Sequence, residues 1–94
     1  MLSSDEAIAM GCKKYRELYP VGTIPRDLEE QGVLGATPEG LRVFVYITYW
    51  FAGERQPFYL FKVSVDRLSG ETRIEHAEDW RELVGREFDN SRSL

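Results

Sequence analysis

Cysteine and histidine are nearly absent from the 94-residue chain, which contains only Cys12 and His76. A single cysteine excludes an internal disulfide and every metal site built from two or more thiolates. Long apolar runs are missing as well, because Arg42 and Thr48 interrupt the most apolar stretch and leave it too short for a transmembrane helix. Residues 1–6 lack the basic and apolar regions of a signal peptide, so we expect a cytoplasmic location.

Catalytic motifs are also missing, since the chain has no GxSxG, HExxH, Walker A or GxGxxG pattern. His76, adjacent to Glu75 and near Glu78, resembles a general base oriented by a carboxylate, but a histidine at the end of an edge strand is the more common arrangement. Cys12 falls on the apolar side of a predicted helix, where cysteine usually packs as a small hydrophobic residue. The adjacent Glu29 and Glu30 lack the alternating spacing of a calcium loop. We therefore predict a protein that is not an enzyme and has no catalytic, cofactor-binding or metal-binding residues.

Acidic residues outnumber basic ones, with 16 Asp and Glu against 12 Lys and Arg and a formal net charge of −4. This charge disfavours binding to nucleic acid and to anionic membranes. Residues 71–89, here called the acidic C-terminal region, hold seven acids and three bases, so they account for the whole net charge. Glu78, Asp79 and Glu82 are candidate contacts in this region for a basic protein partner.

Residues 41–75 contain three segments rich in β-branched and aromatic residues, separated by polar clusters with glycine or proline. These segments, 41–51, 57–66 and 71–75, predict a three-stranded antiparallel meander. The register that gathers apolar residues on one face pairs Val43–Val65, Val45–Val63, Ile47–Phe61 and Tyr49–Tyr59, then Val65–Thr72, Val63–Ile74, Phe61–His76 and Lys62–Glu75. Val33 and Leu34 either pack as an anchor or begin a fourth strand.

The second face of this predicted sheet is more apolar than a solvated face usually is. Its candidate binding residues are Phe44, Tyr46, Trp50, Phe58 and Leu60, together with Arg42. Aromatic residues on a sheet can stack nucleic-acid bases, but such proteins add a basic field that this chain lacks. Three explanations remain open. Trp80 of a last helix covers the face, a homodimer buries it, or another protein binds it.

Helical patterns flank the meander. Ser3 and Glu6 form a capping-box pattern, and apolar residues then recur at helical spacing as far as Tyr19, before Pro20 and Gly22 end the helix. Residues 23–40 predict a connection with a short helical turn after Pro25 and a chain-reversing turn at 37–40. Residues 77–84 predict a short C-terminal helix that ends at Gly85. We therefore expect one domain at residues 1–85 and a polar tail at 86–94.

One local motif supports the same fold. Residues 63–71, Val-Ser-Val-Asp-Arg-Leu-Ser-Gly-Glu, form a strand end and turn that resemble those of the small PepSY and cystatin-like α+β domains. The resemblance implies a helix packed on an antiparallel sheet. The compact, acidic chain is also similar to bacterial immunity proteins that neutralise toxins. These families share no catalytic motif, so the resemblance assigns no functional residue.

The sequence thus predicts an α+β domain, with an N-terminal helix on a meander of three or four strands and a short C-terminal helix. The leading hypothesis is a non-enzymatic protein-binding module, an inhibitor or immunity protein, with no cofactor and no nucleic-acid or membrane partner. One alternative is a ligand-binding or enzymatic cystatin-like domain with a pocket between helix and sheet, lined by Tyr15, Tyr19, Tyr49 and Tyr59. The other alternative is a structural homodimer.

Overall fold

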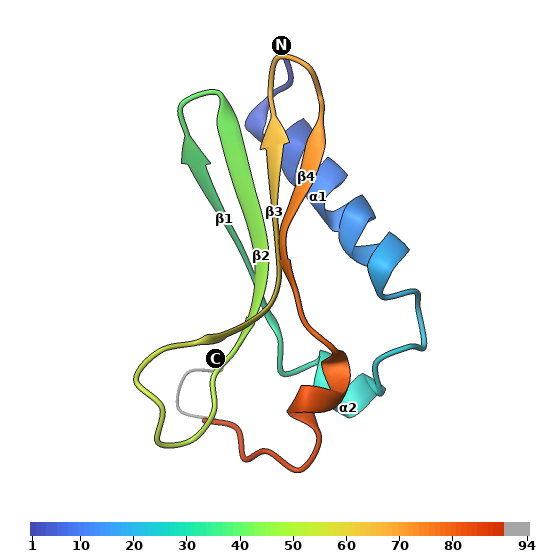
Figure 1. Ribbon diagram of the computed structural model, residues 1–94, viewed down its shortest axis with the longest axis vertical. Helices are drawn as coiled ribbons and strands as arrows, with labels where there is room; N and C mark the ends of the chain where they lie inside the picture. Colours follow the sequence, from blue (N-terminus) through green and yellow to red (C-terminus); the bar gives the residue numbers. More distant parts are fainter. Residues whose placement is uncertain (90–94) are drawn as a thin grey trace.

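A four-stranded antiparallel sheet with one long helix against it forms the molecule in the computed structural model, which describes residues 1–89 (Figure 1). The elements are α1 (Ser4–Leu18), α2 (Arg26–Glu29), β1 (Val33–Glu39), β2 (Arg42–Tyr49), β3 (Phe58–Asp66), β4 (Thr72–Ala77) and the 3-10 turn η1 (Trp80–Leu83). The strands lie in the order β1-β2-β3-β4. The predicted α+β class is confirmed. No helix of the described residues is long and apolar enough to cross a membrane.

Helix α1 begins at the capping box that the sequence predicts. The Glu6 N–H donates to Ser3 Oγ at 3.1 Å, and the Ser3 N–H donates to Glu6 Oε1 at 3.0 Å. The helix runs along one face of the sheet, here called the helix face, where Gly11 lies directly against Val45. Because glycine has no side chain, the helix backbone approaches β2 closely.

The core lies between α1 and the helix face of the sheet. Its central valines alternate along β2 and β3, as the predicted apolar face requires, and each is at most 1% exposed: Val43, Val45, Val63 and Val65. Tyr15 of α1 packs edge-on against the fully buried Phe61, with ring centroids 5.4 Å apart. Beyond the end of α1 the core continues around Ile24, Tyr49, Phe51, Leu60 and Leu83. Removal of this apolar surface from water is the main term that stabilises the fold.

Strand β1 corrects the predicted connection at residues 37–40. Those residues were expected to form a turn, but the strand extends to Glu39 and only Gly40 and Leu41 form the turn to β2. Glu39 pairs with Arg42 across it. Gly40 has a φ of +61°, the sign that a type II′ turn requires at its first central residue. Pro38 fits the strand because β1 is an edge, where one row of N–H groups has no strand partner.

A bulge in β3 shifts the register of the first predicted hairpin. Pairing follows the prediction from Val43–Val65 to Ile47–Phe61, but Thr48 then pairs with Tyr59, which leaves Leu60 as an extra residue. The predicted Tyr49–Tyr59 pair is therefore wrong. An extra residue moves the side chains beyond it to the opposite faces.

A second bulge lies in β4. Val65–Thr72 and Val63–Ile74 pair as predicted, but Lys62 pairs with His76 and Phe61 pairs with Ala77. The predicted Phe61–His76 and Lys62–Glu75 pairs are wrong, because Glu75 is the extra residue. Its carboxylate instead accepts a hydrogen bond of 2.7 Å from the Ser64 hydroxyl on β3.

The predicted C-terminal helix is replaced by the short 3-10 turn η1. Glu78 still belongs to the sheet, since its N–H donates to the Leu60 carbonyl at 2.8 Å. Asp79 then caps η1 by accepting a hydrogen bond from the Arg81 N–H. Residues 86–89 of the predicted tail return to the body of the protein, where Phe88 forms a bridge with Phe51. The rest of the predicted tail, residues 90–94, lies outside the described residues.

Tyr49 contributes a prediction about stability. Its side chain is fully buried, and its hydroxyl has no hydrogen-bond partner among the described residues. Burial raises the pKa of Tyr49, since the charged form would lose its hydration. An unpaired buried hydroxyl costs about 1–3 kcal/mol. We therefore expect Tyr49→Phe to raise the free energy of unfolding by about 1 kcal/mol in chemical denaturation.

Tyr19 provides the control for that prediction. Its hydroxyl donates to the Glu78 carbonyl at 2.6 Å and to the Leu60 carbonyl at 3.3 Å. Tyr19→Phe should therefore lower the free energy of unfolding by about 1 kcal/mol. If both variants lose stability, the Tyr49 hydroxyl has a partner in solution and the prediction fails.

Candidate functional site: the open face of the sheet

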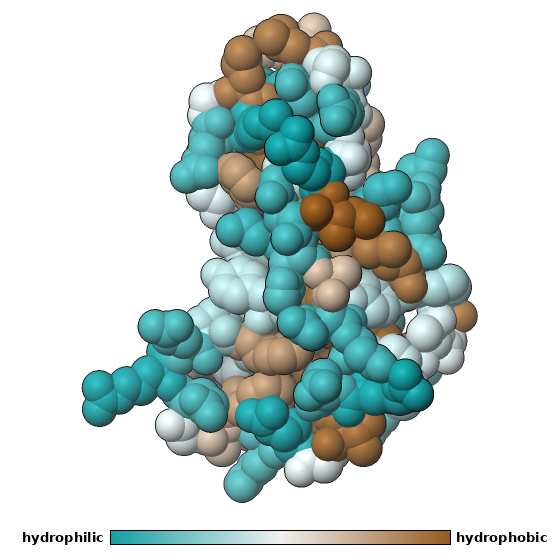
Figure 2. Space-filling view, in the orientation of Figure 1, coloured by the Kyte–Doolittle hydropathy of each residue, from teal (hydrophilic) through white to brown (hydrophobic). Residues whose placement is uncertain are grey.

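The face of the sheet opposite α1, here called the open face, keeps large side chains in contact with solvent. Its central residues are Phe44 and Tyr46 of β2, Tyr59 and Lys62 of β3, and His76 of β4. None of these five is buried, and Tyr59 is 38% exposed, whereas the paired valines of the helix face are at most 1% exposed. Figure 2 shows that, in one view, apolar residues form patches among hydrophilic ones.

Tyr46 is partly used within the fold. Its ring lies over Gly35 of β1, so closely that a Cβ at that position would clash with Tyr46 Cε2. Its hydroxyl is 3.1 Å from the Thr37 hydroxyl, also on β1. Tyr46 thus holds the edge strand to the sheet and fills the space that the glycine leaves.

Lys62 lies at the centre of the open face and contacts two aromatic rings. Its Nζ is 5.1 Å from the ring centroid of Phe44 and 5.9 Å from that of Tyr59. Both distances are within the range of cation–π attraction. The Tyr59 ring also packs edge-on against Tyr46, with centroids 5.7 Å apart. The aromatic row Phe44, Tyr46 and Tyr59 is therefore ordered by contacts with itself and with Lys62.

Polar side chains close one end of this row. Arg42 donates to the Ser64 hydroxyl at 3.3 Å, and that hydroxyl donates to Glu75. The chain of hydrogen bonds crosses three strands and leaves Ser64 fully buried. Arg42, a predicted binding residue, is thus already engaged within the sheet.

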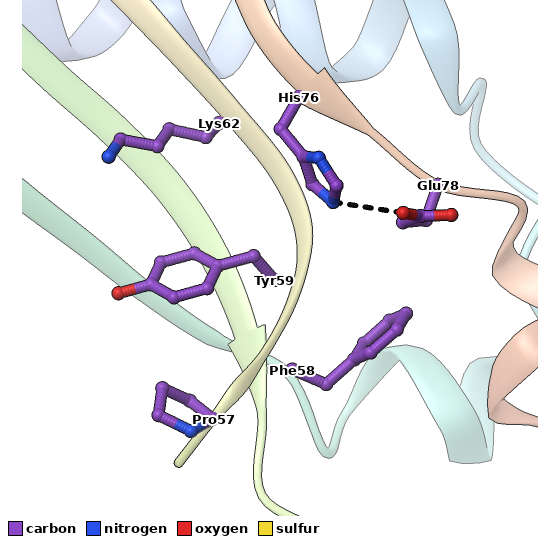
Figure 3. Close-up of a pocket in the computed structure, with 6 residues that line it drawn as sticks. All are labelled: Pro57, Phe58, Tyr59, Lys62, His76 and Glu78. Carbon is purple, nitrogen blue, oxygen red and sulfur yellow. Dashed lines mark ion pairs between the residues drawn. The ribbon is translucent and has the colours of Figure 1, made fainter.

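A hollow of about 440 Å³ opens at the other end of the row (Figure 3). It is lined by Pro57, Phe58, Tyr59, Lys62, His76 and Glu78. In Figure 3 Lys62 and Tyr59 point across β2, whereas Phe58, His76 and Glu78 gather on the opposite side. The two bulges create this arrangement, because they place Tyr59 and His76 on the open face.

His76 and Glu78 contact each other in the hollow. His76 Nε2 is 3.2 Å from Glu78 Oε1, and both side chains are more than 40% exposed. Glu78 is held by its backbone, since its N–H bonds to Leu60 and its carbonyl accepts from the Tyr19 hydroxyl. Of the two carboxylates that lie near His76 in the sequence, Glu75 and Glu78, the structure brings Glu78 to the imidazole.

The structure separates the residues that the sequence grouped on the second face. Phe44, Tyr46 and Arg42 lie on the open face, but Leu60 is fully buried and its inclusion in the surface is wrong. Phe58 is half-buried, with its ring 5.5 Å from that of the core residue Phe51. Half-buried Trp80 packs against the core, together with Phe88. Trp50 is half-buried as well.

Three central residues of the open face were not among the predicted binding residues, namely Tyr59, Lys62 and His76. Strict alternation of side chains along each strand places Tyr59 and His76 on the helix face, because it assumes no bulge between them and Ile47. The one sequence signal for the hollow was the position of His76 next to carboxylates in the sequence. Lys62 was correctly placed on the second face but was not predicted to bind.

The acidic candidates of the C-terminal region differ in their contacts. Asp79 accepts hydrogen bonds from the Arg81 side chain, which lower the pKa of the Asp79 carboxyl. Glu82 and Glu71 are exposed on the surface. Glu78 faces the hollow beside His76. The acidic region therefore borders the open face through Glu78.

The four tyrosines of the ligand-binding alternative do not line one cavity. Tyr15 and Tyr19 pack together in the core with centroids 5.2 Å apart, whereas Tyr59 lies on the opposite face of the sheet. A smaller hollow of about 230 Å³ does lie between α1 and β1, and of the four only Tyr15 is among its lining residues.

An ion pair at one end of this smaller hollow joins α1 to α2. Arg16 Nη2 donates to Glu29 Oε1 at 2.8 Å, and this bond lowers the pKa of Glu29. The Tyr15 hydroxyl donates to the same carboxylate at 3.5 Å. Burial, followed by the nearby Glu29 charge, raises the pKa of Tyr15 to about 12. These contacts fix the segment that leads into β1.

Neither a metal centre nor a relative helps to define the site. Within residues 1–89, no three side chains of His, Cys, Asp or Glu are grouped so that they could hold a metal ion. No family model matches the chain, and comparisons with curated proteins and with solved structures find no similar protein. The resemblance to PepSY and cystatin-like domains therefore stays a prediction, and the geometry alone supports a function.

Proposed function

We propose that this protein is a non-enzymatic protein-binding module, of the inhibitor or immunity type, and that its open face binds the partner. The observation that carries the proposal is the ordered, half-exposed row of Phe44, Lys62 and Tyr59 beside the larger hollow. A cytoplasmic location remains part of the proposal as a prediction.

Side chains that are already ordered in the free protein favour binding. Immobilising a flexible side chain on association costs about 0.5–1.5 kcal/mol, and a side chain that is already held avoids part of this cost. Lys62 is held over two rings, and Tyr59 packs against Tyr46. Tyrosine is also enriched among the residues that dominate binding energy. The row thus supplies anchors, and the hollow can receive a side chain of the partner.

The acidic C-terminal region adds electrostatic attraction for a basic partner surface. Opposite charges on two proteins speed association and lose this effect as salt increases. The active site of a nucleic-acid-cleaving toxin is a basic surface of this kind. We expect the association rate to fall with rising salt concentration, while the dissociation rate changes less.

A pull-down from the native host tests the proposal, with retained proteins identified by mass spectrometry. Wild type is compared with the double variant Tyr59→Glu, Lys62→Glu, which places two acidic groups at the centre of the open face. We expect one partner in stoichiometric amount on wild type and its loss on the double variant.

Val21→Glu is the matched control, since Val21 is 85% exposed in the loop after α1. This variant should retain the partner, and circular dichroism should show all three proteins folded. Retention of the same partner by the double variant would place the site elsewhere. If wild type forms a dimer and the double variant is a monomer, the open face binds a second copy of the chain instead of a different protein. An association rate that is insensitive to salt would contradict only the electrostatic part of the proposal.

A further inference from the structure

Strand β1 is an edge strand whose residues 33–37 lack the usual protection against pairing. Figure 1 shows it as the outermost strand, on the side of the sheet away from β4. Its residues 33–38 carry no charge, and Val33 and Leu34 are 46% and 52% exposed. Natural edges are usually blunted by charged residues, proline or bulges, and in β1 only Pro38 and Glu39, next to the turn, are of this kind. The opposite edge, β4, has both, since it carries Arg73, the bulged Glu75 and His76.

The turn between β1 and β2 determines which peptide groups of β1 point outward. In a two-residue hairpin the residues that flank the turn exchange their backbone hydrogen bonds, and the pattern then alternates along the strand. Glu39 flanks this turn, so Pro38, Ala36 and Leu34 direct their backbone groups away from β2. Pro38 has no N–H to direct outward, which leaves the N–H groups of Leu34 and Ala36 as donors.

The smaller hollow lies beside this edge, on the helix face. Cys12, Tyr15 and Arg16 of α1 form one wall, and Leu34 and Ile47 of the paired strands β1 and β2 form another. Its volume is about 230 Å³. In a sheet, directly opposed residues on neighbouring strands place their side chains on the same face. The residue of an added strand opposite Leu34 would therefore direct its side chain to the mouth of this hollow.

We propose that β1 pairs with an extended segment of a partner protein, which adds a fifth strand and inserts one large apolar side chain into the hollow. Backbone hydrogen bonds supply affinity in this mode of recognition, and pockets for alternate side chains supply specificity. The inference rests on the proposed function, and it specifies that the partner presents an extended strand with a large apolar side chain.

A second copy of the chain fits this edge less well. Antiparallel self-pairing that uses at least two outward residues on each β1 strand places Ala36, Pro38 or Gly40 of the second copy opposite Leu34. None of these three residues has a side chain large enough to fill the hollow of about 230 Å³. An extended segment of a different protein can pair with the edge and also place a leucine or phenylalanine side chain in the hollow.

A synthetic strand tests this inference by NMR. The probe is a capped peptide of the length of β1, with alternating threonine and valine and a central leucine, titrated to millimolar concentration into labelled protein. We expect the largest amide shift changes at Leu34 and Ala36, with smaller changes at Gly35 and Thr37, which face β2. A peptide with central alanine should bind about tenfold more weakly, because it leaves the hollow empty.

Two protein variants at β1 and a control variant at β4 complete the test. Ala36→Pro removes one outward N–H, a group that takes no part in the hydrogen bonds to β2, and should weaken binding about tenfold. Leu34→Glu places a charge at an already exposed position and should abolish binding, whereas Ile74→Glu on the β4 edge should leave it unchanged. Absence of shifts, or equal binding by all variants, would overturn the proposal. Shifts confined to Tyr59, Lys62 and His76 would overturn it while leaving the proposed function intact.

Discussion

Replacing Leu60 by alanine is expected to lower the free energy of unfolding by about 2–5 kcal/mol, the usual cost of truncating a large core side chain. Leu60 is the bulged residue of β3 and is fully buried. Its carbonyl also accepts hydrogen bonds from the Glu78 N–H and the Tyr19 hydroxyl. These backbone contacts remain in the variant, so the loss reports the burial of the side chain.

Urea denaturation followed by circular dichroism measures this loss. Leu68→Ala is the matched control, because Leu68 is 64% exposed in the turn after β3 and should lose less than about 0.5 kcal/mol. A regular β3 strand would place Leu60 on the open face, where truncation would cost little. Equal stability of the two variants would therefore contradict the bulge and restore the alternating register.

Gly11→Ala is expected to destabilise the protein by about 1–2 kcal/mol, although alanine favours an isolated helix by about 1 kcal/mol over glycine. The added Cβ would lie 2.6 Å from Val45 Cγ2 and 2.7 Å from Val45 Cβ. Rotation of the Val45 side chain moves only its Cγ atoms, so it cannot remove the contact with Val45 Cβ. Forced packing of this kind costs about 1–3 kcal/mol, which outweighs the gain in helix propensity.

The partner residue offers the control for this prediction. Val45→Ala alone should destabilise through the space it leaves in the core, but it also removes the contacts of the two Cγ atoms with a methyl group at Gly11, so that only the Cβ contact remains. In a double-mutant cycle the two changes together should cost less than the sum of the single changes. Additive effects, or a stabilising Gly11→Ala, would show that α1 lies farther from β2 than the structure indicates.

Local sequence patterns predicted the elements whose contacts are local. The Ser3 and Glu6 spacing marked the start of α1, because both hydrogen bonds of a capping box lie within one turn. The alternation of valine and polar residues predicted the register of β2 and β3 as far as Ile47. On this part of the sheet the placement of Phe44 and Tyr46 on the open face was correct.

The candidate site could be predicted only in part, because it lies where alternation fails. A bulge is one extra residue, and the residue itself carries no signal, since Leu60 and Glu75 are ordinary strand residues in sequence. Each bulge exchanges the faces of the residues beyond it. The prediction therefore placed Leu60 on the surface and assigned Tyr59 and His76 to the covered face.

The sequence by itself determined the α+β class, the helix that packs on the sheet and the apolar face between them, because hydrophobic periodicity encodes which side of each element avoids water. Only the tertiary structure decided that residues 33–39 form a strand, that η1 replaces a helix and that two bulges shape the hollow. These features depend on contacts between distant segments, such as Tyr46 over Gly35 and Glu78 bonded to Leu60. The free energy of such contacts exceeds local conformational preference, so no short stretch of sequence reveals them.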